Sequence, residues 1–121
     1  MLGDKDVAEV TGNRSRVCAD LPQRAVPDLC ELLVVANSTG FVPDRADLHA
    51  PIARIPEVPT VFGLITEEGV LGRAGVLDVF HCLRRPDEAS FAGGVFVIVR
   101  CDDAETWRLL EEKGHLVSRD G

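Results

Sequence analysis

Four prolines between Gly40 and Thr60 constrain the fold of this chain more than any other feature of its sequence. They are Pro43, Pro51, Pro56 and Pro59. Proline lacks a backbone donor and clashes with the preceding turn, so a long helix is excluded here. We therefore predict an extended central loop with short edge strands.

Long ordered loops in compact domains often serve binding or catalysis. On this ground the loop is a candidate partner-binding or ligand-binding surface, made of Phe41, Asp44, Arg45, Asp47 and His49. In the alternative interpretation the loop is only a structural wrap. Its apolar residues would then pack on the edge of a sheet, and these are Phe41, Val42, Ile52 and Ile55.

The last quarter of the chain has the clearest local signals. Residues 95–99 are β-branched or aromatic and predict a buried strand after Gly93-Gly94. Asp102 then predicts a helix N-cap, and Gly114 predicts the C-terminal cap. The helix has an apolar face around Trp107, which we place in the core. Residues 115–117 are expected to leave as a short extended segment.

This predicted strand, helix and strand over residues 93–118 resembles, in topology, the closing unit of ACT-like ligand-sensing modules. In such modules helices cover one face of a sheet, and the other face often pairs with a second copy. The resemblance implies a sheet-mediated homodimer.

The rest of the chain is more ambiguous. Residues 29–36 suit a buried strand or a helix, and we favour the strand. Residues 61–66 predict another strand. The segment 70–83 suits either a helix or a turn followed by a strand over 76–83, and its glycines favour the strand. Near the N-terminus we expect a short helix over 4–10 and a short strand over 16–19.

These elements together predict a single α+β domain over residues 1–121. Its mainly antiparallel sheet of four or five strands is packed by the C-terminal helix, with the proline-rich loop at its centre. The polar opening, residues 1–27, is expected to be partly flexible.

The net charge of the chain is −7, and Arg84-Arg85 is its only basic doublet. Phosphate contacts need clustered Lys and Arg, so we expect no nucleic-acid partner, whereas a protein with a basic surface would suit the acidic balance. There is no apolar stretch of about 20 residues, as a membrane span would need. We expect a cytoplasmic protein whose cysteines are reduced.

Few residues of the sequence suggest catalysis or metal binding. Cys82 next to His81 is the candidate reactive thiol, although neighbours in a strand point to opposite faces. The paired carboxylates are explained by turns, helix capping and a solvated helix face. No glycine-rich phosphate loop follows a strand, and cysteine pairs with metal-ligand spacing are missing. We therefore assign no catalytic residue, no metal and no cofactor.

We expect a small non-enzymatic binding or regulatory protein of the immunity, antitoxin or adaptor type, acting through protein–protein contacts. The alternative is a small-molecule-sensing α+β module, which would need an apolar cleft near Phe41, Phe62 and Phe80. A small enzyme that depends on a thiol or a histidine is the third possibility.

Overall fold

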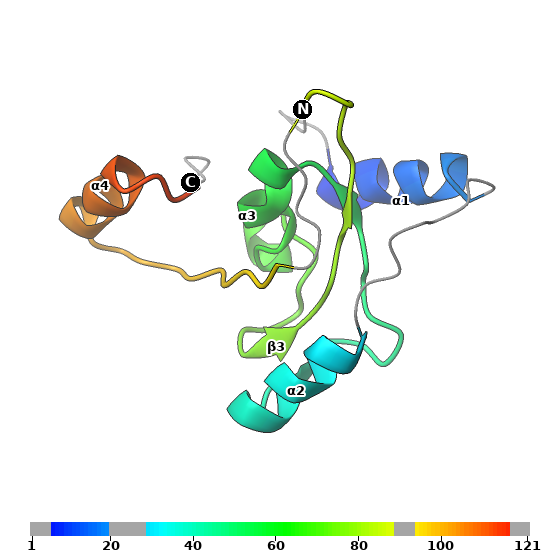
Figure 1. Cartoon of the computed structure of the whole chain (residues 1–121), viewed down its shortest axis with the longest axis horizontal. Helices are drawn as coiled ribbons and strands as arrows, with labels where there is room; N and C mark the ends of the chain where they lie inside the picture. The colour runs from blue at the N-terminus through cyan, green and yellow to red at the C-terminus, as the bar shows by residue number, and fades with distance from the viewer. Residues whose placement is uncertain (1–5, 20–28, 89–93, 117–121) are drawn as a thin grey trace.

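The computed structural model describes residues 6–19, 29–88 and 94–116. Figure 1 shows the order of its elements. Its α-helices and strands are α1 (Val7–Val17), α2 (Leu29–Thr39), β1 (Val42–Pro43), β2 (Ile52–Ala53), α3 (Val58–Val61), β3 (Val76–Leu77), β4 (His81–Cys82) and α4 (Ala104–Glu112). Two 3-10 turns, η1 (Ile55–Glu57) and η2 (Ile65–Glu67), flank α3. We call the described residues 6–88 the body and residues 94–116 the arm.

The strands form two short parallel pairs, in which β1 lies beside β3 and β2 beside β4. The predicted antiparallel sheet of four or five strands is therefore wrong for the described residues. Each strand has two residues, because Pro43 ends β1, Pro51 precedes β2 and Gly75 precedes β3 with φ +72°. Parallel strands need long crossover connections, and the connections of the body contain α3 and the proline-rich loop.

Two segments predicted as strands are not strands: residues 29–36 are helical, and residues 61–66 run from the end of α3 into η2. Residues 29–36 belong to α2, whose Leu, Glu and Ala residues are good helix formers. Gly40, at φ +73°, ends this helix with its N–H bonded to the Ala36 carbonyl oxygen. Residue 61 closes α3, in which Pro59 occupies the first turn, where its missing donor costs nothing.

Helix α1 is longer than the predicted helix over 4–10, and it includes residues 16 and 17, where a strand was expected. The Asp6 carboxylate accepts from the Glu9 N–H and caps its start. The helix continues through Gly12, a poor helix former, because tertiary contacts hold it: Val7 and Thr11 are buried.

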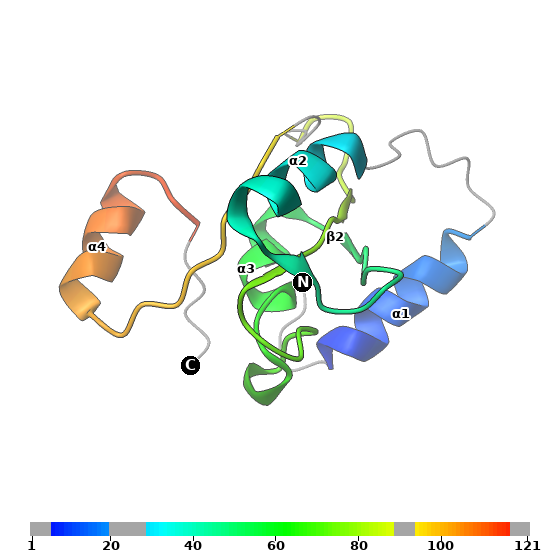
Figure 2. The same ribbon diagram turned by 90° about the horizontal axis from the view of Figure 1, so that it is seen from below.

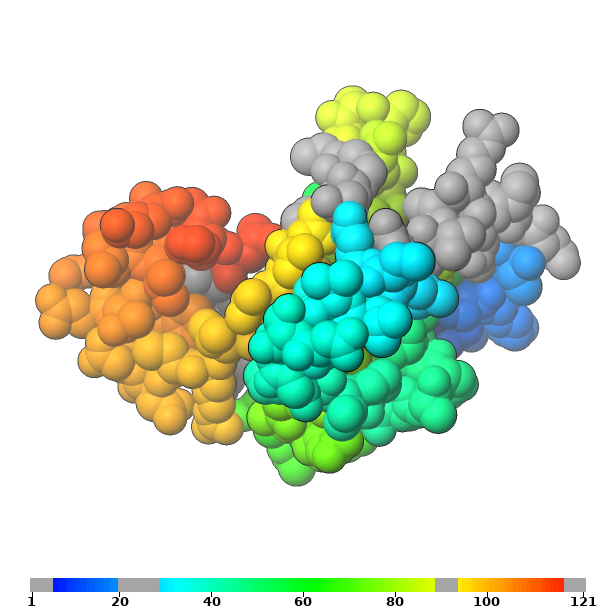
Figure 3. Space-filling model, turned by 60° about the horizontal axis from the view of Figure 1, so that its bottom comes forward, coloured from blue at the N-terminus to red at the C-terminus, as the bar shows by residue number. Residues whose placement is uncertain are grey.

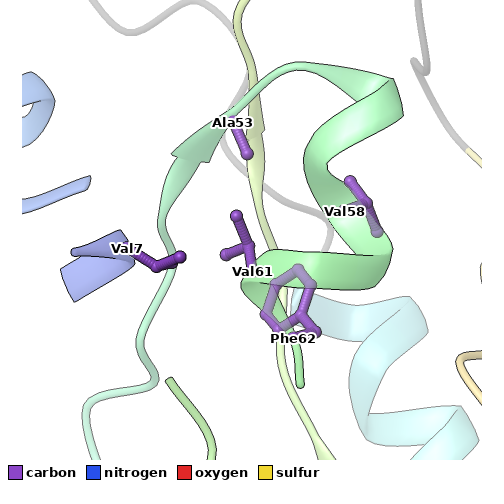
Figure 4. Close-up of a cluster of buried hydrophobic side chains, with 5 residues drawn as sticks. All are labelled: Val7, Ala53, Val58, Val61 and Phe62. Carbon is purple, nitrogen blue, oxygen red and sulfur yellow. The ribbon is translucent and has the colours of Figure 1, made fainter. Parts of the chain in front are cut away.

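The core of the body lies between α1, β2 and α3 (Figure 4). Its buried members are Val7, Ala53, Val58, Val61 and Phe62. An ion pair closes one side: Arg14 donates to both oxygens of the Glu57 carboxylate, at 2.7 and 3.1 Å, and to the Ile52 carbonyl oxygen. The Glu57 side chain is only 2% exposed. Because an unpaired buried carboxylate would be costly, Arg14 ties α1 to β2 and η1.

The arm leads away from the body, and α1 and α4 lie at opposite ends of the molecule (Figures 1 and 2). The predicted C-terminal helix is confirmed as α4, capped by Asp103 rather than Asp102 and followed by Gly114 at φ +84°. Residues 95–99 are extended without forming a strand, and Val97 is 82% exposed. Phe96 contacts the body, with its ring 5.4 Å from both Phe62 and Phe80.

Trp107 does not lie in the core. It is half-buried within the arm, where its Nε1 donates to the Cys101 carbonyl oxygen, and no residue of α4 is buried. Residues 115 and 116 are not in a strand, and residue 117 of that predicted segment lies outside the described residues.

Helix α2 covers one face of the body in Figure 3, with the arm standing out beside it. Although α2 is rich in apolar residues, none of them is buried, and Leu29, Leu33 and Val34 are exposed. It has 11 residues. In the described part of the chain, helices with the length and apolar character of a membrane span are absent.

Candidate active site

The loop between β1 and β2, residues 44–51, has a strained backbone. Leu48 and Ala50 adopt positive φ angles of 60° and 43°, a region that residues with a Cβ rarely enter. Each such residue costs roughly 1 to 2 kcal/mol, so the conformation persists only where the surroundings impose it. His49 lies between these two residues.

The His49 ring is paired with the Asp44 carboxylate. Its Nε2 lies 2.8 Å from Asp44 Oδ2, and the side chains of His49 and Asp44 are only 17% and 11% exposed. The Gly72 N–H also donates to Asp44 Oδ2, at 3.0 Å. The hydrogen bond from Gly72, then that from His49, lowers the pKa of Asp44 below its usual value. Asp44 is therefore a carboxylate near neutral pH, ready to orient an imidazole.

A second carboxylate, Asp78, holds the backbone on which His49 sits. Its Oδ1 accepts from the N–H of Ala50 and of Val79, both at 2.9 Å. The His49 N–H donates to Oδ2 at 3.0 Å and is shared with Oδ1 at 3.2 Å. The histidine is thus fixed at its ring by one aspartate and at its main chain by another.

A pocket of about 730 Å³ opens beside the loop. One wall is the face of α1 that includes Thr11 and Ser15, and another is the turn around Gly69. Arg45 and His49 line it from the loop. The half-buried histidine therefore meets a space large enough for a small organic molecule.

The structure brings together some of the predicted surface residues. Asp44 and His49 pair, and Arg45 reaches the same pocket. Arg45 is itself engaged by Asp47 through two hydrogen bonds of 2.7 and 2.6 Å, which lower the pKa of Asp47 to about 2. Phe41 is exposed and does not line the pocket. The wrap interpretation holds in part, because Ile52 is buried, whereas Phe41 and Val42 are not.

The other sequence candidates lie elsewhere. Cys82 is half-buried in β4 and lines neither this pocket nor a smaller one of about 250 Å³ around Arg54 and Glu88. Phe62 is buried and packs against Phe80 and Phe96, so these rings fill the place where the sensing module needed an apolar cleft. Among the described residues, no group of three His, Cys, Asp or Glu side chains is arranged to hold a metal ion.

Sequence reasoning missed Asp78, Gly72 and the α1 wall of the pocket. Asp78 had a signal: it is the only charged residue in the apolar run over 76–80. An acid in such a run usually has a buried donor to satisfy. The sequence held no such signal for Gly72, because it binds Asp44 through its backbone N–H and any residue type has one except proline.

A half-buried histidine that a carboxylate orients at a pocket is typical of enzymes that transfer protons. The profile of a family described as "Oxidoreductase DRL, catalytic domain" matches residues 26–119. The match covers most of the chain, which therefore belongs to this family. Neither a curated protein nor a solved structure matches the chain.

This membership overturns the expected function. The prediction of a non-enzymatic binding or regulatory protein of the immunity, antitoxin or adaptor type is wrong, because the family is one of oxidoreductase catalytic domains. The sequence misled because residues of an active site that the fold brings together need not follow a recognisable spacing. The third possibility, a small enzyme that depends on a thiol or a histidine, agrees better with the match in being an enzyme.

Proposed function

We propose that this chain is the catalytic domain of an oxidoreductase in which His49, oriented by Asp44, exchanges a proton with an oxygen atom of the substrate. The main observation in support is the His49–Asp44 pair at a pocket, in a chain whose family is that of an oxidoreductase catalytic domain. Oxidation of a hydroxyl group releases a proton, and reduction of a carbonyl group takes one up. A histidine is suited to both directions near neutral pH.

The pairing fixes which ring nitrogen acts. Asp44 is ionised and can only accept, so Nε2 must donate its hydrogen to Oδ2. The lone pair of a neutral ring is then on Nδ1, which has no hydrogen-bond partner within the described residues. Nδ1 takes the substrate proton, and the Asp44 carboxylate stabilises the imidazolium that forms. In the reverse direction the same nitrogen returns the proton.

An oxidoreductase also needs an electron carrier, which commonly presents phosphate groups to a helix N-terminus. Helices α1 and α4 do not fit this use. The carboxylates of Asp6 and Asp103 already accept from their first-turn N–H groups, at 3.1 and 2.8 Å, and would repel a phosphate. We assign no described residue to the carrier, and the proposal concerns the proton alone.

The test is an activity measurement on the protein purified from its own cells with any chains that accompany it. Oxidation of NADH and NADPH is followed with a panel of hydroxy ketones and aldehydes. We expect His49→Gln to lower turnover by about 100-fold or more, the usual contribution of a general acid or base. Asp87→Ala is the matched control, because Asp87 is an exposed aspartate outside the pocket.

Two results would contradict the proposal in different ways. Full turnover by His49→Gln would remove His49 from the mechanism. Failure of the wild-type protein to oxidise either coenzyme with any compound of the panel would count against the redox activity itself.

Other expectations stay predictions. A cytoplasmic location is supported by four free thiols, at Cys18, Cys30, Cys82 and Cys101. The single domain, a second copy of the chain and a basic protein partner are likewise untested.

A further inference from the structure

The loop that contains His49 has no regular secondary structure of its own, yet both of its ends are fixed. Strand β1 precedes it and pairs with β3, while β2 follows it and pairs with β4. The segment between β3 and β4, residues 78–80, therefore connects the same two strand pairs. Parallel pairing at both ends holds the two connections opposite each other, which brings Asp78 to the backbone of His49 across 29 residues of sequence.

Asp78 binds the part of the loop for which no main-chain hydrogen bond within the described residues of the loop is seen. One main-chain hydrogen bond within the loop, from the Leu48 N–H to the Arg45 carbonyl oxygen, closes its first part. Beyond it, two consecutive N–H groups, those of His49 and Ala50, point to the Asp78 carboxylate. Ala50 itself has a positive φ angle, and His49 lies between Ala50 and the other positive-φ residue, Leu48. A carboxylate that binds consecutive N–H groups dictates the direction of the chain between them.

We propose that Asp78 is a positioning residue: it fixes the strained backbone at His49 and thereby places the imidazole against Asp44. This inference rests on the proposed function, in which the His49–Asp44 pair transfers the proton. Asp78 bonds to main-chain atoms of His49 and is not assigned a contact with the ring or the substrate. Its effect on the reaction passes through the orientation of the ring.

Nitrogen-15 NMR of the histidine rings tests this without a substrate. The chain has three histidines, so the His49 signals are assigned from their loss in His49→Gln. In the wild-type protein we expect one dominant Nε2–H form, with this proton shifted downfield by its bond to Asp44. In Asp78→Ala we expect that form to give way to a mixture of tautomers. Asp87→Ala is the matched control and should keep the wild-type spectrum.

The conservative variant Asp78→Asn separates positioning from simple loss of structure. The amide oxygen can replace Oδ1, which accepts from Ala50 and Val79, but an NH₂ group in place of Oδ2 cannot accept from His49. We therefore expect Asp78→Asn to fold and to fall between the wild type and Asp78→Ala in its Nε2–H population. An unchanged His49 spectrum in Asp78→Asn and in a folded Asp78→Ala would overturn the proposal.

Hydrogen exchange in the wild-type protein gives a test that needs no variant. The amide hydrogens of His49 and Ala50 should exchange at least about tenfold more slowly than those of exposed loop residues. Unprotected exchange at both positions would overturn the proposal, whether or not Asp78→Ala folds. If instead His49→Gln keeps full turnover while the wild-type ring shows the bonded Nε2–H and both amides are protected, the proposed function fails and the positioning role of Asp78 stands.

Discussion

In the body, side chains from α1, β2 and α3 meet around Val61, which is fully buried, whereas in the arm α4 has no buried residue at all. The body and helix α4 also differ in the reach of their polar contacts, although Arg100, which precedes α4, pairs with Glu67 of the body at 2.5 Å. Asp44 binds Gly72, and Arg14 binds Glu57, across long stretches of sequence. In the arm, Asp103 caps its own helix through Thr106. Tertiary contacts thus build the body, and local signals build α4.

The largest effect on stability should follow from removing the Phe62 ring from the aromatic cluster that it forms with Phe80 and Phe96. Phe62→Ala removes a buried ring that packs against Phe80 and Phe96. We expect a loss of about 3 to 5 kcal/mol in the free energy of unfolding, measured with urea and circular dichroism. A loss below about 1 kcal/mol would show that the body does not depend on this cluster.

A loss of similar size should follow from removing the cation that ties α1 to β2 and η1. Arg14→Ala leaves the Glu57 carboxylate buried and without its partner. Breaking a buried ion pair in this way costs about 3 to 5 kcal/mol. Arg16→Ala is the matched control in the same helix, because Arg16 is exposed and contacts Asn13. Equal stabilities of the two variants would contradict the docking of α1.

The matching substitution in the arm should have little effect on the body. Trp107→Ala removes a half-buried ring of α4, so we expect the unfolding of the body to change by less than about 1 kcal/mol. NMR signals of Val61 and Phe62 during urea unfolding report on the body alone. A loss near that of Phe62→Ala would erase the distinction between the two regions.

The smallest expected effect is the change in stability at acidic pH that is due to Asp44. The pKa of Asp44 is lowered in the folded protein by Gly72 and then by His49, so its contribution to stability is present above its usual pKa of 3.8. That contribution is lost as the pH falls through the lower, folded pKa. The stability gap between the wild type and Asp44→Asn should therefore be full at neutral pH and shrink in acid. A gap that grows below pH 3.8 would contradict the pairing.

The sequence predicted what depends on neighbours in the chain. The capped helix before Gly114 and the irregular proline-rich loop are both found, because capping and proline geometry act within a few residues. Residues 29–36 and 61–66 were misassigned, since apolar runs of this length suit a strand or a helix and tertiary packing decides. For residues 95–99 the β-branched run predicted a strand, but among the described residues the segment has no strand partner, and only Phe96 is packed against the core.

Only part of the candidate site could be predicted from the sequence. Asp44 and His49 stood in a loop chosen for its prolines, but their pairing depends on a fold that places Gly72 and Asp78 around them. No short spacing encodes this arrangement. Phe41 was included by position alone, and it lies outside the pocket.

The position of Trp107 allows the arm to be followed by tryptophan fluorescence. It is the only tryptophan of a chain that has no tyrosine, so the intrinsic fluorescence at the red edge of aromatic absorption comes from α4. Its ring is half-buried and held by the Cys101 carbonyl oxygen. A molecule that covers α4 would move this emission to shorter wavelengths, and a ligand confined to the His49 pocket would leave it unchanged.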